Sequence, residues 1–464
     1  MGGFFFYLCK KEKHGDETER EVKSACYKWL KKENSVAEEM FFETEVNGEL
    51  FVVFLFLCCT ASKTNTVFLS VCGQRCLLWR GSWLSDPEGI LQKENAVEEL
   101  EKERGPFSYV LFDAGCGSVF YGRDSIGRLS LLVSSPSSRR PGLAVSSASC
   151  GMGGWEECSG NQSIEHDIKS GKETPRAVRS WEIEKAIEPK DVISMTALKI
   201  EKILRRIIPK DIDEIGVLFS GGLDSMVLAH FLCRCVPEDV AVFLVNVSFM
   251  FEGSYETPDR VNAIAGQKEL EAVSKRKTFF VPVDVSLEEY REARMHVQAV
   301  IQPSDTQMDA SIGLPVWFAC GGVLGTDASG RVPALLVSGT GPDELLGGYS
   351  RHRTVFRHGG ELGLEKELRR ELAEIGRRSL GRDDRCASDC GREMLHPYLD
   401  EEFVSWVLSL PLSARCDLTK ERGVGDKHLL RGVAKAAGLD SAAGRVKRAI
   451  QFGSRSAKMA EKKE

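Results

Sequence analysis

The most informative run of this chain is Gly216-Val217-Leu218-Phe219-Ser220-Gly221-Gly222-Leu223-Asp224-Ser225. The apolar residues Ile215–Phe219 predict a short strand, and the residues from about Ser225 to Cys235 have a helical pattern. Between them, two glycines let backbone N–H groups approach an anion closely, and the following helix start adds positive potential. The run therefore predicts a strand, a phosphate-binding turn and a helix, although a plain glycine-rich βα turn has the same outline.

The side chains of this turn indicate phosphate accompanied by a metal ion. Ser220 and Ser225 offer hydroxyl donors. Asp224 would repel a bare phosphate, so its presence predicts an intervening Mg²⁺. The turn does not end in Gly-Lys-Ser/Thr, which distinguishes it from the loop of P-loop NTPases.

A second segment has a similar arrangement. Leu335–Ser338 predicts a strand, and Gly339-Thr340-Gly341-Pro342-Asp343-Glu344 follows it. Asp343 could supply a second carboxylate to the same Mg²⁺. The alternative is a solvated acidic pair in a surface loop, and the position directly after a strand favours the functional interpretation.

From Asp191 onward the sequence alternates between helix and strand patterns. Further strands are expected at Val240–Val247 and Thr278–Val283, and helices at Ile193–Ile208 and Ser286–Val300, where Ser286 and Glu289 have capping-box spacing. This alternation predicts an α/β fold, with a parallel sheet covered by helices on both faces. Ligands of such sheets bind beyond the carboxyl ends of the strands, where both glycine-rich segments are expected.

The N-terminal part contains short β-type runs broken by Gly, Asp and Ser, which predict an antiparallel, layered α+β domain. The runs are Phe51–Leu57, Val67–Val71, Tyr109–Phe112, Ser118–Tyr121 and Leu129–Val133. Ser134–Arg176 is rich in Ser, Gly and Pro, and predicts a linker with one strand at Leu143–Ser146. The expected divisions are an unassigned segment 1–46, a domain 47–150, a linker 151–190 and a domain 191–464.

Composition excludes several classes of protein. The 464 residues suggest two or three domains, and 62 basic against 68 acidic residues give no positive excess for binding nucleic acid. The fifteen cysteines have no repeated spacing, which favours reduced thiols, and the CxxxC pairs Cys72/Cys76 and Cys386/Cys390 are unlike zinc sites. The apolar run Leu50–Ser62 is too short to span a bilayer, and Phe4–Cys9 lacks signal-peptide flanks. We therefore expect a soluble cytoplasmic protein, without membrane or nucleic-acid partners.

Together these segments resemble the asparagine synthetase family, whose synthetase half has an ATP-pyrophosphatase (PP-loop) fold. Ser220–Ser225 is similar to that family's pyrophosphate loop, and Ser338–Tyr349 to its SGEGSDExxGGY segment. Gly391–Pro411 and Lys427–Arg431 resemble its substrate-side helices. Gly348–Arg353, Leu380–Arg385 and Lys447–Arg455 resemble the asparagine synthetase domain-containing proteins within it. The resemblance implies nucleotide contacts from Leu218, Ser220, Gly221, Gly222, Leu223, Asp224, Ser225, Val247, Ser338 and Gly339.

The N-terminal half resembles the family's glutaminase only in pieces, as a degenerate class II glutamine amidotransferase-like domain of Ntn type. Asn47-Gly48-Glu49 is similar to a glutamine-binding segment, which implies substrate contacts from Asn47 and Glu49. Gly105–Tyr109 and Tyr121–Arg128 resemble two later segments. The family's nucleophile is a cysteine directly after the initiator methionine, where this sequence has Gly2. The first thiol, Cys9, is internal, so we expect the glutaminase half to be defective.

Two departures concern the synthetase half. The glutamate of the family's SGEG is Thr340 here, and the catalytic lysine three residues before Phe452 is Ala449. Lys447 and Arg448 lie beside that position, and either could stabilise the charge of a polyphosphate transition state. A solvated basic helix end is an equally open interpretation of these two residues.

The resemblance implies a reaction. ATP would bind with Mg²⁺ held by Asp224 and Asp343, and an acceptor carboxylate, expected to be that of aspartate, would form an acyl-adenylate and release pyrophosphate. Ammonia, free or from glutamine, would then displace AMP. Asp384 and Arg385 would line the acceptor side, where Arg385 could grip a carboxylate or simply form a surface ion pair. The other hypothesis is an inactive nucleotide-binding relative with a regulatory or partner-binding role.

Overall fold

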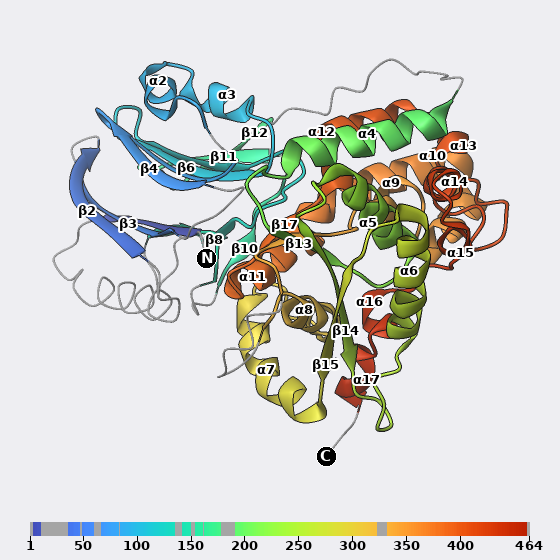
Figure 1. The fold of residues 1–464 in the computed structure, drawn as a ribbon. Coiled ribbons are helices and arrows are strands. Elements are labelled where there is room, and N and C mark those ends of the chain that lie inside the picture. Colours follow the sequence, from blue (N-terminus) through green and yellow to red (C-terminus); the bar gives the residue numbers. More distant parts are fainter. Residues whose placement is uncertain are drawn as a thin grey trace. The chain divides into compact units, whose positions relative to one another are not determined.

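The computed structural model describes residues 3–10, 36–46, 49–59, 66–82, 84–134, 142–149, 154–160, 162–177, 191–322 and 332–461. The chain forms two compact units, each described here by itself. The first unit contains residues 1–180 together with 298–305 and 373–391, and the second contains 181–297, 306–372 and 392–464. Figure 1 shows the strand-rich and the helix-rich parts of the chain.

The first unit contains two antiparallel six-stranded sheets in its described residues. One has the order β10-β8-β9-β1-β3-β2, from Glu156–Glu157, Leu132–Ser134, Leu143–Ser146, Gly3–Lys10, Glu49–Cys59 and Val36–Val46. The other has the order β12-β11-β7-β6-β5-β4, from Glu173–Ala177, Gln162–Asp167, Ser118–Arg123, Phe107–Asp113, Arg75–Gly81 and Thr66–Cys72. The predicted antiparallel, layered organisation is confirmed.

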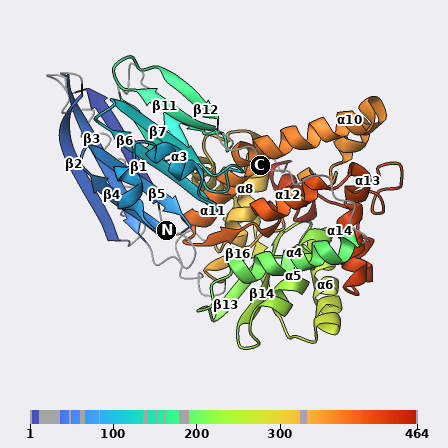
Figure 2. The same cartoon turned by 90° about the horizontal axis from the view of Figure 1, so that it is seen from above.

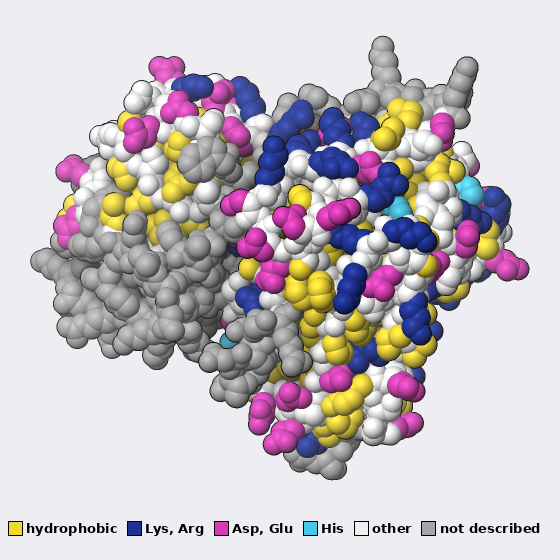
Figure 3. Space-filling view, in the orientation of Figure 1, with side chains coloured by type: hydrophobic (Ala, Val, Ile, Leu, Met, Phe, Trp, Pro, Cys, Tyr) yellow, Lys and Arg dark blue, Asp and Glu magenta, His cyan; other side chains and the backbone are white. Residues whose placement is uncertain are grey.

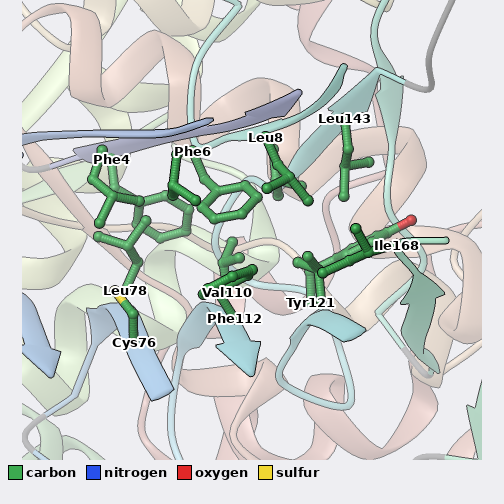
Figure 4. Packing of buried hydrophobic residues seen from close by; sticks show 14 of the residues in the cluster. Phe4, Phe6, Leu8, Cys76, Leu78, Val110, Phe112, Tyr121, Leu143 and Ile168 are labelled. Carbon is green, nitrogen blue, oxygen red and sulfur yellow. The ribbon is translucent and has the colours of Figure 1, made fainter. Parts of the chain in front are cut away.

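A hydrophobic core lies between these two sheets (Figure 4). Phe4, Phe6 and Leu8 of β1 point toward Val110 and Phe112 of β6, because alternate residues of a strand share one face. The outer face of the second sheet packs against the short helices α2 (Pro87–Gln92) and α3 (Ala96–Glu101) in a second apolar cluster. The unit is therefore layered as sheet, sheet and helices.

One expectation about the N-terminal half is wrong, and some of its strands were not predicted. The segment 1–46 contains β1, an interior strand of the first sheet, since Phe5–Leu8 pairs with both β3 and β9. The expected linker 151–190 contains β10, β11 and β12, which extend both sheets. The strand Arg75–Gly81 was not expected at all, although its neighbours on both sides were.

The second unit is built on a five-stranded parallel sheet with the order β15-β14-β13-β16-β17 (Figures 1 and 2). The strands are Phe279–Val285, Ala241–Phe249, Glu214–Leu218, Leu335–Val337 and Glu393–Leu395. The main helices are α4 (Val192–Ile207), α5 (Leu223–Cys235), α6 (Pro258–Ser274), α7 (Leu287–Val300), α8 (Gln307–Ala319), α10 (Ser350–Ile375), α12 (Glu401–Ser409) and α14 (His428–Ala436). Shorter pieces are α9 (Pro342–Leu345), a 3-10 turn (Pro397–Leu399), α13 (Leu412–Arg415), α15 (Asp440–Ala443), α16 (Ile450–Gly453) and α17 (Ser456–Glu461).

Helices cover both faces of this sheet, as predicted. Asn246 on one face of β14 accepts a hydrogen bond from Arg260 of α6 at 2.7 Å. Phe249, three residues later and on the opposite face, packs its ring against Tyr290 of α7 and Phe318 of α8. The reciprocal hydrogen bonds of Ser286 and Glu289 confirm the capping box at the start of α7.

The strand order reverses between β13 and β16. The chain runs from β13 outward to β14 and β15, then returns to β16 on the other side of β13 and continues to β17. Such a reversal opens a crevice at the carboxyl ends of the two central strands, which is where ligands bind in open parallel sheets. Both glycine-rich segments follow these two strands.

The surface of the second unit carries mixed charges. Figure 3 shows Lys and Arg side chains gathered over α4 and α12, and the contacts there include Lys199 and Lys202 with Glu402, and Arg206 with Asp400. These basic groups are therefore balanced by acidic partners. Among the described residues, every helix is too short or too polar to traverse a lipid bilayer.

Candidate functional site

The turn after β13 has the geometry of an anion-binding loop. Gly221 has φ +69°, and a side chain there would come within 2.4 Å of the Asn262 backbone, so only glycine fits. Gly222 is the N-cap residue of helix α5 and provides no side-chain cap, so the first N–H groups of the helix are left for another acceptor. The Ser220 hydroxyl accepts from the Gly222 N–H at 3.2 Å, and Ser225 donates to the Gly222 carbonyl at 3.1 Å.

The turn after β16 lies directly against the first turn. A Cβ on Gly339 would lie 3.2 Å from the Asp224 Cβ and 3.3 Å from the Ser225 nitrogen. Since Gly339 is a glycine, the two backbones can approach closely. The predicted convergence of the two strand-end turns is confirmed, while their binding of a nucleotide stays a prediction.

One ammonium group joins the two predicted metal ligands. The Lys427 Nζ lies 2.6 Å from Asp224 Oδ2 and 2.8 Å from Asp343 Oδ1. Lys427 precedes α14 and has φ 52°, a left-handed conformation that is costly for a lysine, by about 1–2 kcal/mol. Its backbone N–H donates to the Leu346 carbonyl at 2.9 Å, which holds this conformation in place. The ammonium stands where a cation shared by the two carboxylates would lie.

The same pair of carboxylates retains unused acceptor capacity. In the described part of the chain, Asp224 Oδ1 is buried and accepts no hydrogen bond, while Asp343 Oδ1 has the Lys427 ammonium at 2.8 Å as its contact. Carboxylate oxygens suit Mg²⁺, which usually takes one or two of them and completes its shell with phosphates and water. No set of three or more His, Cys, Asp or Glu residues gathers as a metal site in the described ranges. The two aspartates therefore fit Mg²⁺ bound together with a phosphate ligand.

Lys447 is the second cation at this site. Its Nζ lies 2.6 Å from Asp343 Oδ2. Burial alone would raise the pKa of the Asp343 carboxyl, but Lys427 and Lys447 outweigh burial and hold that pKa well below its usual range. Burial opposes the charge of Lys447, yet Asp343 and then Asp224 raise its pKa above its usual value. Asp343 and Lys447 therefore remain charged over the physiological pH range.

The structure separates Lys447 from Arg448. Arg448 is exposed, whereas Lys447 is half-buried and bonded to Asp343. Ala449 precedes α16 in an extended conformation. Thr340 is half-buried, and its hydroxyl pairs with the Ser338 hydroxyl at 2.9 Å. Of the two candidates beside Ala449, only Lys447 contacts a predicted site carboxylate.

The remaining predicted nucleotide residues lie around the same strand ends. Leu218 is the last residue of β13, and Val247 is buried in β14 beside it. The Phe219 N–H donates to the Val245 carbonyl at 2.7 Å, and the Asn246 amide donates to the Phe219 carbonyl at 2.9 Å. These contacts join the start of the phosphate loop to the neighbouring strand.

Asp384 and Arg385 belong to the first unit, where both are buried in structural ion pairs. Asp384 accepts two hydrogen bonds from Arg80, at 2.6 and 2.8 Å, and Arg385 donates to Ser130 at 2.7 Å and to Glu157. The alternative of a surface ion pair for Arg385 is therefore wrong, because its partner Glu157 is a buried glutamate. A substrate-binding role for either residue stays a prediction, and these contacts give it no support.

The predicted glutamine contacts are only partly visible. Asn47 lies outside the described residues. Glu49 is described, and it forms an exposed ion pair with Lys10 at 2.6 Å. Its role in binding a substrate stays a prediction.

Sequence reasoning missed Lys427 and Tyr398 as site residues. Both lie in segments that resembled the family's substrate-side helices, which was the available signal. The Tyr398 hydroxyl donates to the Asp224 carbonyl at 3.2 Å, and burial followed by the Asp224 charge raises its pKa. A buried, neutral tyrosine therefore supports the backbone of Asp224.

Comparisons with known proteins place the chain in a family. A family model described as asparagine synthase matches residues 210–363 and 356–462. Asparagine synthetase domain-containing protein 1 of Gallus gallus is 41% identical over 292 residues, 53% of this chain and 46% of that protein. An asparagine synthetase domain-containing protein of Saccharomyces cerevisiae is 29% identical over 406 residues, 80% of this chain and 74% of that protein.

The chain spans about half the length of the vertebrate relatives it matches. A solved glutamine phosphoribosylpyrophosphate amidotransferase from B. subtilis matches at 9% identity with a TM-score of 0.30, covering 61% of this chain and 91% of that one. The family model matches more than half of the residues, so the chain belongs to the asparagine synthase family.

Proposed function

We propose that this chain is an ATP-dependent synthetase that activates a substrate carboxylate as an acyl-adenylate. The observation that carries the proposal is the pair Asp224 and Asp343, which meet at one ammonium at the strand-order reversal and leave Asp224 Oδ1 buried without a hydrogen bond. Family membership supports the same conclusion. ATP and Mg²⁺ are the implied substrate and metal, and aspartate and ammonia the implied co-substrates.

The roles of the chain's own residues follow from their contacts. The N–H groups at Gly222 and the hydroxyls of Ser220 and Ser225 would bind the leaving pyrophosphate. Mg²⁺, bound through Asp224 and Asp343, would neutralise phosphate charge. Lys447 is the cation positioned to stabilise the additional charge on the phosphates in the transition state.

The chemistry is an exchange at the α-phosphorus. A carboxylate oxygen of the substrate bonds to that phosphorus while the bond to the bridging oxygen of pyrophosphate breaks. Ammonia then attacks the acyl carbon, loses a proton, and releases AMP. Aspartate would give asparagine by this route.

The test is AMP and pyrophosphate formation from ATP, aspartate and ammonia by the purified chain. Asp224→Asn and Asp343→Asn should reduce AMP formation at least about 100-fold, because each removes a charge that binds the metal-phosphate group. Asp239→Asn is the matched control, since Asp239 is an exposed aspartate of the same unit. AMP formation that survives both site substitutions would refute the assignment.

A second candidate is a nucleotide-binding protein without turnover. The specific observations in its favour are Thr340, which cannot act as the anion that the family's glutamate provides, and Ala449 in the position of the family's lysine. Binding of ATP that depends on Asp224, with no AMP formed from aspartate and ammonia, would favour this candidate over the synthetase.

A further inference from the structure

Arg445 ties the C-terminal segment of the second unit to the phosphate loop. Its guanidinium Nη1 donates to the Gly221 carbonyl, and its Nη2 donates to the Ser441 hydroxyl at 3.1 Å and to Glu269 of α6 at 3.4 Å. The side chain is only 13% exposed. The Arg445 guanidinium thus joins the phosphate loop to α6 and to α15.

The surroundings of Arg445 are shaped to hold it. A Cβ on Gly266 of α6 would lie 3.2 Å from Arg445 Nη1 and 2.7 Å from the Met226 sulfur, so a glycine leaves the space for the guanidinium. The Arg431 side chain donates to the backbone carbonyl of Arg445 at 2.9 Å. Both the backbone and the side chain of Arg445 are therefore fixed.

Fixing the Gly221 carbonyl also fixes the next N–H group. The Gly221 carbonyl and the Gly222 N–H belong to one planar trans peptide, and they point in opposite directions. With the carbonyl held toward Arg445, the Gly222 N–H is directed to the other side, where the Ser220 hydroxyl accepts it at 3.2 Å. A cationic partner on the carbonyl also polarises the peptide and strengthens its N–H as a donor.

We propose that Arg445 is a positioning residue for pyrophosphate: it orients the Gly221–Gly222 peptide so that the Gly222 N–H binds the leaving group. Arg445 also sets the start of the short segment that brings Lys447 to Asp343, two residues later. This inference rests on the proposed function, because it takes the turn after β13 as the phosphate loop. It goes beyond the family resemblance, which implied no role for Arg445.

The experiment compares ligands that do and do not contain a pyrophosphate group. Binding of magnesium pyrophosphate, ATP and AMP is measured by calorimetry for the wild type, Arg445→Ala and Arg445→Lys. Arg445→Ala should weaken pyrophosphate and ATP binding about tenfold, as expected for one lost charge-assisted contact, and leave AMP binding unchanged. Arg445→Lys should lose less affinity than Arg445→Ala, because lysine keeps the positive charge but lacks the planar guanidinium with its several donors.

The matched control is Arg234→Ala, since Arg234 is an exposed arginine at the other end of α5, paired with Glu201 at 2.9 Å. Unchanged pyrophosphate binding in Arg445→Ala would overturn the inference, and so would an equal loss for AMP, which would indicate general unfolding. If Arg445→Ala does not fold, Glu269→Gln, which removes the acidic partner of Arg445, is measured instead. It should weaken the binding of pyrophosphate and ATP by a smaller factor and leave AMP binding unchanged. Unchanged pyrophosphate binding in Glu269→Gln would also overturn the inference. A wild-type chain that binds neither ATP nor pyrophosphate would instead refute the proposed function, and this inference with it.

Discussion

Replacing Lys427 by methionine should make the stability of the second unit depend on Mg²⁺. The substitution keeps most of the side-chain length and removes the ammonium shared by Asp224 and Asp343. The Lys427 side chain is 2% exposed and that of Asp343 is 9% exposed, so the carboxylates would be left close together and poorly solvated. Two adjacent buried anions repel each other, and a bound metal ion would relieve that repulsion.

The magnitude follows from burial and from the remaining partners. Removing one member of a buried ion pair costs about 3–5 kcal/mol. Asp343 keeps Lys447 at 2.6 Å, so we expect the lower end, about 3 kcal/mol, when Mg²⁺ is chelated. Binding of Mg²⁺ at about 100 times its dissociation constant would raise the free energy of unfolding by about 2.7 kcal/mol. The variant should therefore regain nearly all of its lost stability in saturating Mg²⁺.

The assay is urea unfolding with EDTA and with increasing Mg²⁺, followed by tryptophan fluorescence. Lys420→Met is the control, because Lys420 forms an exposed ion pair with Asp417 and its loss should cost less than about 1 kcal/mol. The reasoning fails if Lys427→Met and Lys420→Met are equally stable in EDTA. It also fails if Mg²⁺ stabilises Lys427→Met no more than it stabilises the wild type.

Three further predictions follow from the site. Lys447→Met should lower AMP formation about 100-fold or more, whereas Arg448→Ala should lower it less than about fivefold, because Lys447 contacts Asp343 and Arg448 is exposed. Equal losses would contradict this division. Burial raises the pKa of the Asp259 carboxyl to about 7, despite the nearby charges of Lys447 and Arg448. The folded state therefore holds a proton that the unfolded state loses, and the contribution of Asp259 to stability falls as pH rises from about 4 to 7. Asp259→Asn should flatten this part of the pH–stability curve measured by urea unfolding. Gly221→Ala should destabilise the protein more than Gly73→Ala in thermal unfolding. Both glycines have positive φ (+69° and +59°), but only a Cβ on Gly221 would come within 2.4 Å of backbone atoms, those of Asn262. Similar losses of stability would contradict the steric argument.

The parallel sheet and its two glycine-rich turns were predictable because their signals are local. The strands β13 and β16, which lead into the turns, are short and mainly apolar runs, and each turn carries its own glycines next to a helix start. The meeting of the two turns followed from the rule that parallel strands present their carboxyl ends at one edge. No residue far away in sequence was needed for either step.

Other features depend on pairings between distant residues, which sequence patterns do not show. Lys427 is one of 62 basic residues, and nothing in its local sequence shows that its ammonium lies between two aspartates distant in the chain. The strand β1 is a short apolar run whose interior position comes from pairing with both β3 and β9. The strand β11 contains several polar residues, so its sequence pattern predicted a linker instead of a strand.

The discontinuous first unit has a consequence for how the chain acquires its structure during synthesis. Arg123 and Glu157 form a buried pair within the N-terminal part, but Arg80 and Glu157 also take partners from Asp384 and Arg385 in α11 (Gly381–Asp389). Unmatched buried charge is strongly unfavourable, so we expect the two sheets to reach their final state only after α11 has left the ribosome. The parallel sheet of the other unit is translated almost entirely in the meantime, and a nascent chain stalled before residue 381 should remain protease-sensitive in its N-terminal part.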